Sequence, residues 1–325
     1  MSPQAAQNPQ GDEVVDTPYG FYRYDDFCAL PAPDDVWLIK PIMPAGGWVN
    51  VYGQPKKARK TYLALGMAWA VSSGQDSWLG FDVLKHGPVL FLEADTPHAM
   101  FKQRMKDIHE GGYDMSNVWT ASLMTMPYPF NITEHEDILN DMIEVVRADA
   151  NTPPVMIVFD TGRKLHLLDE NSSDQMTMLM GALERVSGRD MSKLLITHDK
   201  KGPSEGDQDA DNEREGGDLM RGNRGSGAVA GAVDTVVKMT TKGYMHFQGR
   251  ACGEQHKKLK FTHVGGEMGY MWEEDVDNTV VVEARTLLKT YKKASERSLA
   301  RMLASSTGID EERARGIIRR EKEKA

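Results

Sequence analysis

Short apolar runs alternate with amphipathic stretches of helical period between Gly46 and about Arg285. Strands buried on both faces of a parallel sheet have this continuous apolar character, and the stretch after each one supplies the crossover helix. The alternation therefore predicts an α/β fold with a largely parallel central sheet. The expected strands are Trp48–Tyr52, Pro88–Leu92, Val155–Phe159 and Lys193–Thr197, and the expected helices are Thr61–Ser73, His98–His109, Glu134–Asp149 and Asp174–Ser187.

The two ends of the chain differ from this central part. After Asp234 the pattern changes to short strands and turns, which predict an antiparallel extension of the sheet at 234–239, 243–248 and 259–263. The last stretch predicts two helices, Ser295–Ser305 and Asp310–Glu323. We therefore expect an N-terminal tail and arm over 1–45, an α/β domain over 46–285 and a helical segment over 286–325.

Charge is distributed unevenly along the chain. The net charge is −9, but residues 286–325 carry eleven Lys and Arg against six Asp and Glu, a balance of +5 that leaves −14 on the other 285 residues. Such a body is not expected to coat nucleic acid through bulk positive charge. The basic tail has two interpretations, a helix-turn-helix fragment that binds DNA or a helical pair that docks on a neighbouring subunit.

Other features bear on the compartment. No apolar run approaches the roughly 20 residues that a membrane span needs, and the polar N-terminus does not resemble a secretory signal. Cys28 and Cys252 lie far apart and indicate neither a disulfide framework nor a metal knuckle. We predict a cytoplasmic protein with no membrane partner.

The segment Gly53-Gln54-Pro55-Lys56-Lys57-Ala58-Arg59-Lys60-Thr61 follows a predicted strand and opens a predicted helix, which is the context of a P-loop. Backbone N–H groups there hold phosphates, the lysine reaches the outer phosphates and the hydroxyl ligates Mg²⁺. The match is irregular, because Arg59 stands where glycine is usual and the loop holds one residue too many. We place Lys60-Thr61 in register, since this keeps the magnesium ligand. The expected cofactor-binding residues are Gly53, Pro55, Lys56, Arg59, Lys60, Thr61 and Tyr62.

Three polar residues end predicted strands. Glu93 ends the run from Val89, at the rim of a strand expected beside the P-loop, while Asp160 and His198 end two further runs. Carboxyl ends of parallel strands form the crevice where α/β sheets bind ligands. One acid there can hold magnesium, with Thr61 and Asp160 as the expected metal residues, and a second acid can polarise the attacking water.

At this point the chain resembles the RecA-like ATPases related to RepA-type plasmid and phage replicative helicases, whose core is shared with DnaB, RadA and KaiC. The resemblance runs from about Val36 to Phe261. The matching segments are Met43–Gly47, Tyr52–Lys56 with Lys60-Thr61, Gly87–Glu93, Gln103-Arg104, Ile157–Thr161, Thr197–Lys201 and Arg224–Asp234.

The resemblance implies a RecA-like P-loop core that binds ATP and Mg²⁺, with Glu93 as the catalytic carboxylate and Asp160 as the acid that holds magnesium. It implies that His198 couples the γ-phosphate to a nucleic-acid loop. It also implies a ring, possibly a hexamer, or a filament, in which Arg224 or Arg250 reaches the next subunit's site. The implied partner is single-stranded DNA.

Several functions stay open. The first is a DNA-dependent ring helicase of a phage or mobile element, and the second is a slow, nucleotide-gated assembly factor such as a helicase loader or regulatory ring. A small-molecule kinase is third, without a lid or acceptor pocket to support it. The loop Gly202–Gly217 is too acidic to grip phosphates, whereas its flanks at 200–201 and 221–224 and the basic segment Gly162–His166 are candidates to face a channel.

Overall fold

The computed structural model describes residues 22–30, 36–170, 172–188, 190–198, 226–292 and 294–323. The chain divides into two units at Val36/Trp37. In the first unit, one helix is described, α1 (Tyr24–Ala29). The second unit contains everything from Trp37 on, so residues 37–44, which the sequence assigned to the arm, belong to the larger unit.

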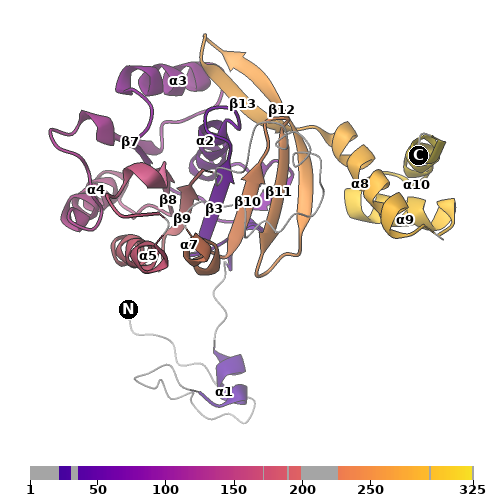
Figure 1. Ribbon diagram of the computed structural model, residues 1–325, viewed down its shortest axis with the longest axis horizontal. Helices are drawn as coiled ribbons and strands as arrows, with labels where there is room; N and C mark the ends of the chain where they lie inside the picture. The colour runs from indigo at the N-terminus through magenta and orange to yellow at the C-terminus, as the bar shows by residue number, and fades with distance from the viewer. Residues whose placement is uncertain are drawn as a thin grey trace. The chain divides into compact units, whose positions relative to one another are not determined.

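A nine-stranded sheet forms the centre of the larger unit (Figure 1), in the order β13-β12-β11-β10-β3-β9-β8-β6-β7. The six strands from β10 to β7 are parallel, and β11, β12 and β13 continue the sheet in antiparallel pairing. The α/β fold with an antiparallel extension is thus confirmed. The strands are β3 (Trp48–Gly53), β6 (Val89–Glu93), β7 (Val118–Ser122), β8 (Met156–Asp160), β9 (Ser192–Ile196), β10 (Thr235–Met239), β11 (Tyr244–Gly249), β12 (Gln255–Gly265) and β13 (Gly269–Glu274).

Alternate residues of each central strand enter two separate hydrophobic layers, because successive side chains point to opposite faces of a sheet. In β3, Val49 and Val51 pack into the layer beneath α2 and α3, whereas Trp48 and Tyr52 pack into the layer beneath α4, α5 and α7. Both layers are apolar, which explains why the strands have no polar alternation. The covering helices are α2 (Lys60–Ser72), α3 (His98–Glu110), α4 (Glu136–Ala150), α5 (Ser173–Ser187) and α7 (Ser226–Ala232).

A second, four-stranded sheet packs over α2, in the order β2-β1-β5-β4. Its strands are β1 (Trp37–Lys40), β2 (Met43–Pro44), β4 (Ser77–Trp78) and β5 (Phe81–Val83). Leu38, Ile42 and Trp78 from this segment join the same core as Leu65 and Met67 of α2. The helix is apolar around most of its circumference because protein covers it on both sides.

The β12–β13 hairpin is held against α3 at its tip. The Asp107 carboxylate on α3 accepts a hydrogen bond from the Met268 backbone N–H at 2.8 Å and another from Gln103 at 2.6 Å. These hydrogen bonds lower the pKa of Asp107. A Cβ at Gly269 would collide with the Gly265 carbonyl, so the turn requires glycine there. The hairpin is thereby fixed beside the C-terminal half of α3.

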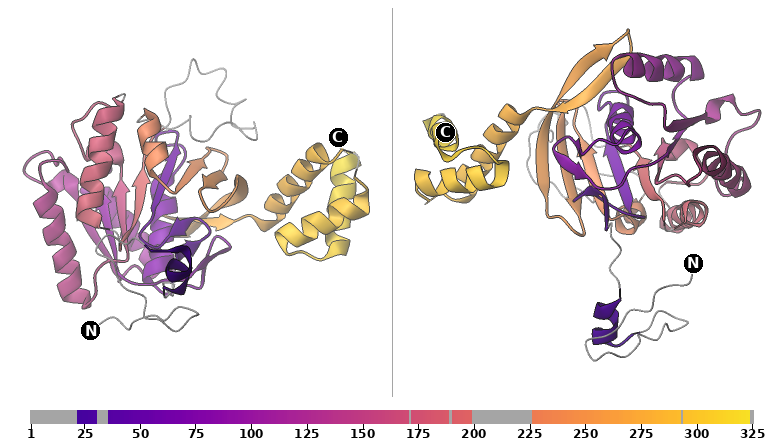
Figure 2. Two further views of the ribbon diagram at one scale, coloured as in Figure 1. Left: turned by 90° about the horizontal axis from the view of Figure 1, so that it is seen from below. Right: turned by 180° about the vertical axis from the view of Figure 1, so that it is seen from behind.

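Three helices end the chain, and Figure 2 shows them from two further sides. They are α8 (Val276–Thr290), α9 (Glu296–Thr307) and α10 (Glu311–Glu323). The sequence predicted the last two, but α8 crosses the expected boundary at 285/286. Among the described residues, no helix has the length and apolar character needed to cross a bilayer.

Candidate nucleotide site

The P-loop connects β3 to α2, and Lys60 opens the helix with its side chain folded back into the loop. The Lys60 Nζ donates to the Gly53 carbonyl at 2.9 Å and to the Gln54 carbonyl at 3.4 Å, and it lies 3.3 Å from His198 Nδ1. Lys60 is buried, whereas the side chain of Arg59 is exposed. This geometry supports the register in which Lys60 and Thr61, and not Arg59 and Lys60, take the phosphate and hydroxyl positions.

The backbone shows how the loop accommodates its extra residue and its missing glycine. Lys56 and Arg59 both adopt left-handed conformations, with φ of 62° and 51°. For a residue with a side chain this costs roughly 1–2 kcal/mol, which is why glycine is usual at such a position. The extra residue is absorbed within the loop, so that Lys60 still begins the helix.

Contacts from the β12–β13 hairpin hold Arg59 in this conformation. The Trp272 indole N–H donates to the Arg59 carbonyl at 3.3 Å, and the Arg59 guanidinium lies 4.2 Å above the centre of the Phe261 ring. A cation–π contact of this kind contributes about 0.5–1 kcal/mol at an exposed site. The hairpin therefore offsets much of the strain that arginine introduces.

Gly53, the first residue of the loop, must be glycine because a larger residue would collide with its neighbours. A Cβ at this position would stand 2.3 Å from the Met239 carbonyl oxygen of β10 and 3.0 Å from the Ala58 Cβ. The backbone of β10, which pairs with β3, leaves no room for it. Pro55 and Lys56 lie exposed on the loop.

Four polar groups form a row across the carboxyl edge of the parallel strands. In the order of the strands β3, β9, β8 and β6 these are Lys60, His198, Asp160 and Glu93. The sequence had placed the strand of Glu93 beside the P-loop strand. This expectation was wrong, because β9 and β8 lie between β3 and β6. Glu93 instead stands opposite Asp160 in the β6–β8 register. The two carboxylates are therefore brought together at the edge of adjacent strands.

Both carboxylates are buried and only partly satisfied. The Glu93 Oε1 accepts hydrogen bonds from the backbone N–H groups of Asp95, at 3.0 Å, and Thr96, at 2.5 Å. The Glu93 Oε2 and the Asp160 Oδ2 have no hydrogen-bond partner among the described residues. Burial raises the pKa of Glu93, and it raises the pKa of Asp160 to about 6, against the lowering effect of nearby Thr61. Two incompletely paired acids in a dry site are a strained arrangement that a cation would relieve.

Arg104 of α3 belongs to the same cluster, although no role was expected for it from the sequence. Its guanidinium lies 4.6 Å from the centre of the Tyr62 ring, and its positive charge lowers the pKa of both Glu93 and Asp160. Its Nε and Nη1 are buried without a hydrogen-bond partner in the described part of the chain. The signal in the sequence was its place on the helix that follows Glu93, but only packing shows that this face turns toward the acids.

The other expected site residues lie elsewhere. The Tyr62 side chain points to the hairpin, where its hydroxyl donates to the Met268 carbonyl at 3.1 Å. Arg250 follows β11 at the opposite edge of the sheet, next to the start of β10, where it lies 3.7 Å from Asp234 and donates to the Gly231 carbonyl. Within one chain the structure therefore does not bring Arg250 to Lys60. Arg224 lies outside the described residues, as do residues 199–225 as a whole.

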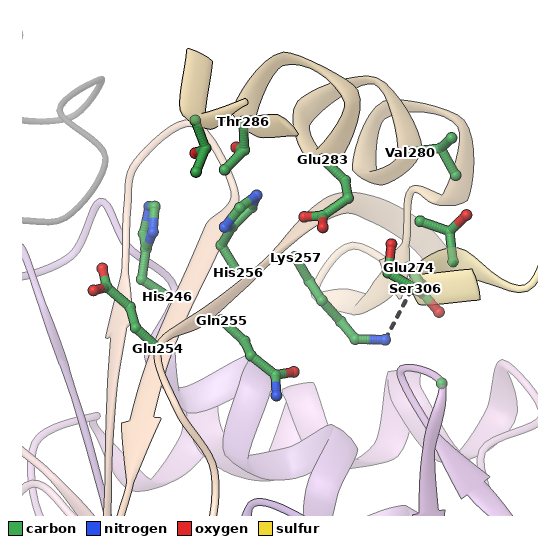
Figure 3. A pocket seen from close by; sticks show the side chains of 13 residues that line it. His246, Glu254, Gln255, His256, Lys257, Glu274, Val280, Glu283, Thr286 and Ser306 are labelled. Atoms are coloured by element: carbon green, nitrogen blue, oxygen red, sulfur yellow. Dashed lines mark hydrogen bonds and ion pairs between the residues drawn. The ribbon is translucent and has the colours of Figure 1, made fainter. Parts of the chain in front are cut away.

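Two hollows accompany the sheet. One of about 450 Å³ adjoins the carboxyl edge, between the residue after Glu93 and the loop after Asp160, and it is lined by Ala94, Leu123, Met124, Pro129, Phe130, Arg163, Lys164, His166 and Leu167. The other, of about 900 Å³, lies between β11, β12 and the C-terminal helices (Figure 3), where Lys257 and Glu274 pair at 2.9 Å. It contains none of the groups of the P-loop row, so its size does not make it the nucleotide site.

Comparison with known families agrees with this geometry. The family model described as "AAA domain" matches residues 23–204, more than half of the chain. The chain belongs to the AAA domain family. The matched part of this AAA-domain chain contains the P-loop, Glu93, Asp160 and His198 and ends before Arg250, and the chain is accordingly a nucleotide-binding protein of the P-loop ATPase class.

One solved structure similar to the AAA-domain chain is a KaiC-like protein from the hyperthermophilic archaeon Pyrococcus horikoshii. The sequence identity is 15%, and the similarity covers 72% of this chain and 93% of the archaeal one with a TM-score of 0.42.

Proposed function

We propose that this chain hydrolyses ATP and acts as a RecA-like motor on DNA, as a RepA-like ring helicase of a phage or mobile element. The observation that carries the ATPase part is the pairing of Glu93 with Asp160 at the edge of β6 and β8, where each has one buried oxygen without a hydrogen-bond partner in the part of the chain that the structure describes. Lys60 begins the helix at the same edge. Buried acids beside a P-loop are the arrangement that phosphoryl transfer to water requires.

The residues present fit ATP and Mg²⁺. The N-cap residue of α2, Arg59, makes no side-chain capping hydrogen bond, so a phosphate can take the place of a cap at the N-terminus of the helix. The Asp160 Oδ2 and the Thr61 hydroxyl would hold the magnesium ion, which when bound neutralises phosphate charge. Lys60 would exchange its contacts with two loop carbonyls for contacts with the outer phosphates.

Glu93 is the group that we assign to water activation. Its Oε1 is fixed by two backbone N–H groups, which leaves Oε2 to accept the proton of the attacking water. The water oxygen then bonds to the γ-phosphorus, and the bond to the bridging oxygen breaks to release ADP. Because its raised pKa brings the carboxylate nearer to working pH, it is a better proton acceptor than an exposed glutamate.

Arg104 supplies positive charge from within the same chain. Its two unpartnered N–H donors form no ion pair with either acid among the described residues, although both acids feel its charge. We assign these donors to phosphate oxygens that become more negative as the reaction proceeds. Arg224 and Arg250 remain the candidates for an arginine that acts on the next subunit in a ring or filament. Arg250 would have to do so across a subunit boundary, because it lies at the opposite edge of the sheet from its own Lys60.

Single-stranded DNA is the partner that we propose for the loop after β8. Arg163 and Lys164 are exposed basic residues at the hollow beside the carboxyl edge, next to exposed Leu167 and Met124, whereas burial lowers the pKa of His166. Cationic and apolar side chains together suit a nucleic-acid strand, whose phosphates and bases they contact respectively. His198, which touches Lys60, would link the nucleotide to this side of the molecule.

The test is the rate of ATP hydrolysis with and without single-stranded DNA, together with mass from light scattering with and without nucleotide. We expect stimulation by DNA, a nucleotide-dependent oligomer, and loss of at least about 100-fold in turnover for Lys60→Ala and Glu93→Gln. The control is Lys106→Ala, which removes an exposed lysine of α3 whose partner is Glu110. Turnover that no nucleic acid changes would overturn the motor proposal.

A slow, nucleotide-gated assembly factor is the second candidate. The observation that favours it is Arg59, whose left-handed backbone and contact with Phe261 make the loop stiffer than a glycine loop. This candidate predicts nucleotide-dependent assembly with little turnover. The light-scattering and rate measurements above therefore separate the two.

A further inference from the structure

The last three helices form a small bundle with a core of its own. Its buried side chains come from all three helices and are Val280, Ala284, Leu287, Leu299, Ala300, Leu303, Ala314, Ile317 and Ile318. None of these belongs to the two layers of the central sheet. The sequence had indicated only two helices, which rarely make a stable unit. The third helix, α8, supplies the missing apolar face.

The connection between α9 and α10 is a short, well-defined turn. Gly308 ends α9 in a left-handed conformation, with φ of 72°, and its N–H donates to the Ala304 carbonyl. Asp310 then begins α10, because its Oδ1 accepts a hydrogen bond from the Arg313 N–H at 2.8 Å. Two helices joined in this way, with a third packed behind them, have the organisation of a helix-turn-helix domain.

The outward face of α10 is basic and has a glycine at its centre. Ala314, Ile317 and Ile318 turn inward, so the helical period places Gly316 and Arg319 opposite them, with Arg315 and Arg320 on either side. All three arginines are exposed. The surrounding charge balance is the +5 of residues 286–325, on a chain that is otherwise strongly acidic.

Nothing in the fold of the described chain explains Gly316. Its backbone is helical, and a Cβ added there would meet no described heavy atom within 4 Å. Glycine lowers helix stability relative to alanine, so its presence has a cost that packing does not offset. Glycine does allow the backbone of another molecule to approach closely. The positive charge of the three arginines around it favours a molecule whose backbone is anionic.

We infer that α10 binds the phosphate backbone of duplex DNA through Arg315, Gly316 and Arg319, and so anchors the chain on a double helix. This contact does not depend on ATP hydrolysis, and it differs from the single-strand contact proposed above. The acids at the two ends of α10, Glu311 and Glu312 in its first turn and Glu321 and Glu323 in its last, direct the contact to the middle of the helix. An acidic protein surface is the competing occupant.

The test measures binding of a short fluorescein-labelled duplex to the full-length protein by anisotropy, without nucleotide and over a series of salt concentrations. Removing two phosphate contacts in Arg315→Ala/Arg319→Ala is expected to weaken binding equally for unrelated sequences and to lower the salt slope by about 2. The control is Arg147→Ala, which removes an exposed arginine of α4. An unchanged dissociation constant in the double variant would overturn the inference.

Gly316→Ala separates binding from folding. Alanine should raise the unfolding midpoint, while its methyl group holds the DNA away and weakens binding several-fold. A variant that is more stable but binds as well as the parent would contradict the assignment of Gly316. Lys60→Ala should retain duplex binding, so the duplex-binding inference can be tested independently of the ATPase proposal. If the double variant forms a smaller oligomer by light scattering while its DNA binding is unchanged, the basic face of α10 would be assigned to a protein partner instead.

Discussion

Replacing Asp160 with asparagine should make the nucleotide-free protein more stable while it destroys ATP hydrolysis. Asp160 is buried opposite Glu93, one of its oxygens has no hydrogen-bond partner among the described residues, and desolvation raises its pKa from 3.8 to about 6. A difference of about 2 pKa units corresponds to about 3 kcal/mol between the two protonation states. Asparagine is close to the protonated acid in shape and charge, so it should recover most of that free energy of unfolding.

The raised pKa of Asp160 also determines how the free energy of unfolding changes with pH. Because the folded-state pKa lies above the unfolded value, the folded protein holds the proton more tightly, and the stability from this group is complete below about pH 4. It is lost as the pH rises to about 6, and it stays lost above that pH. The asparagine variant has no such loss. The gap in unfolding free energy should therefore grow from near zero at pH 4 to about 3 kcal/mol at neutral pH.

Urea unfolding across this pH range, without nucleotide and with chelator, measures the gap directly. The matched control is Asp141→Asn, which removes an exposed carboxylate from α4 and should leave stability unchanged within about 0.5 kcal/mol. With Mg²⁺ and ATP the order should reverse, because only the parent gains stability from the ligand. A variant that is less stable than the parent at neutral pH, or a gap that ignores pH, would refute the reasoning.

Three further substitutions probe the loop and its neighbours. Arg59→Gly removes left-handed strain of roughly 1–2 kcal/mol, but it also removes a cation–π contact with Phe261 of about 0.5–1 kcal/mol. The free energy of unfolding measured in urea should therefore change by no more than about 1 kcal/mol. A loss of stability well beyond that would mean that the hairpin contacts dominate. Gly53→Ala places a methyl group against the Met239 carbonyl. It should lower the free energy of unfolding by about 1–3 kcal/mol and weaken binding of a fluorescent ATP analogue. The control is Gly231→Ala, because a Cβ there would meet no described heavy atom within 4 Å. Arg104→Ala should reduce ATP turnover by about 10²-fold with Arg104→Lys in between, as measured by phosphate release, and equal turnover in all three proteins would remove Arg104 from the site.

Much of the central fold could be predicted because its determinants are local. The run from Trp48 to Tyr52 is apolar on both faces, and both faces are indeed covered by helices. The meeting of Lys60, His198, Asp160 and Glu93 followed from one rule, that parallel strands bring their carboxyl ends to a common edge. No local pattern fixes the order of those strands, however, and the sequence placed the Glu93 strand too close to the P-loop.

Short elements with few residues were beyond local patterns. The strands at 37–44 were taken for an arm, because two- and four-residue strands carry too little periodicity to distinguish them from a Pro-rich loop. Their side chains are buried only because α2 offers a second apolar face. Similarly, α8 was not recognised as a helix of the C-terminal bundle, since its partners lie on helices further along the chain.

By itself, then, the sequence determined the alternation of strands and helices, the P-loop with its irregular arginine, and the acids that end two strands. Tertiary structure alone decided what makes that irregular loop tenable. Arg59 holds a left-handed backbone because Phe261 and Trp272, some 200 residues away, pack on it. Arg104 joins the site because α3 and α2 cover the same face of the sheet, so that its guanidinium reaches Tyr62, and Glu93 meets Asp160 because β6 and β8 are neighbours. Contacts between distant residues depend on how layers pack, and no window of sequence contains that information.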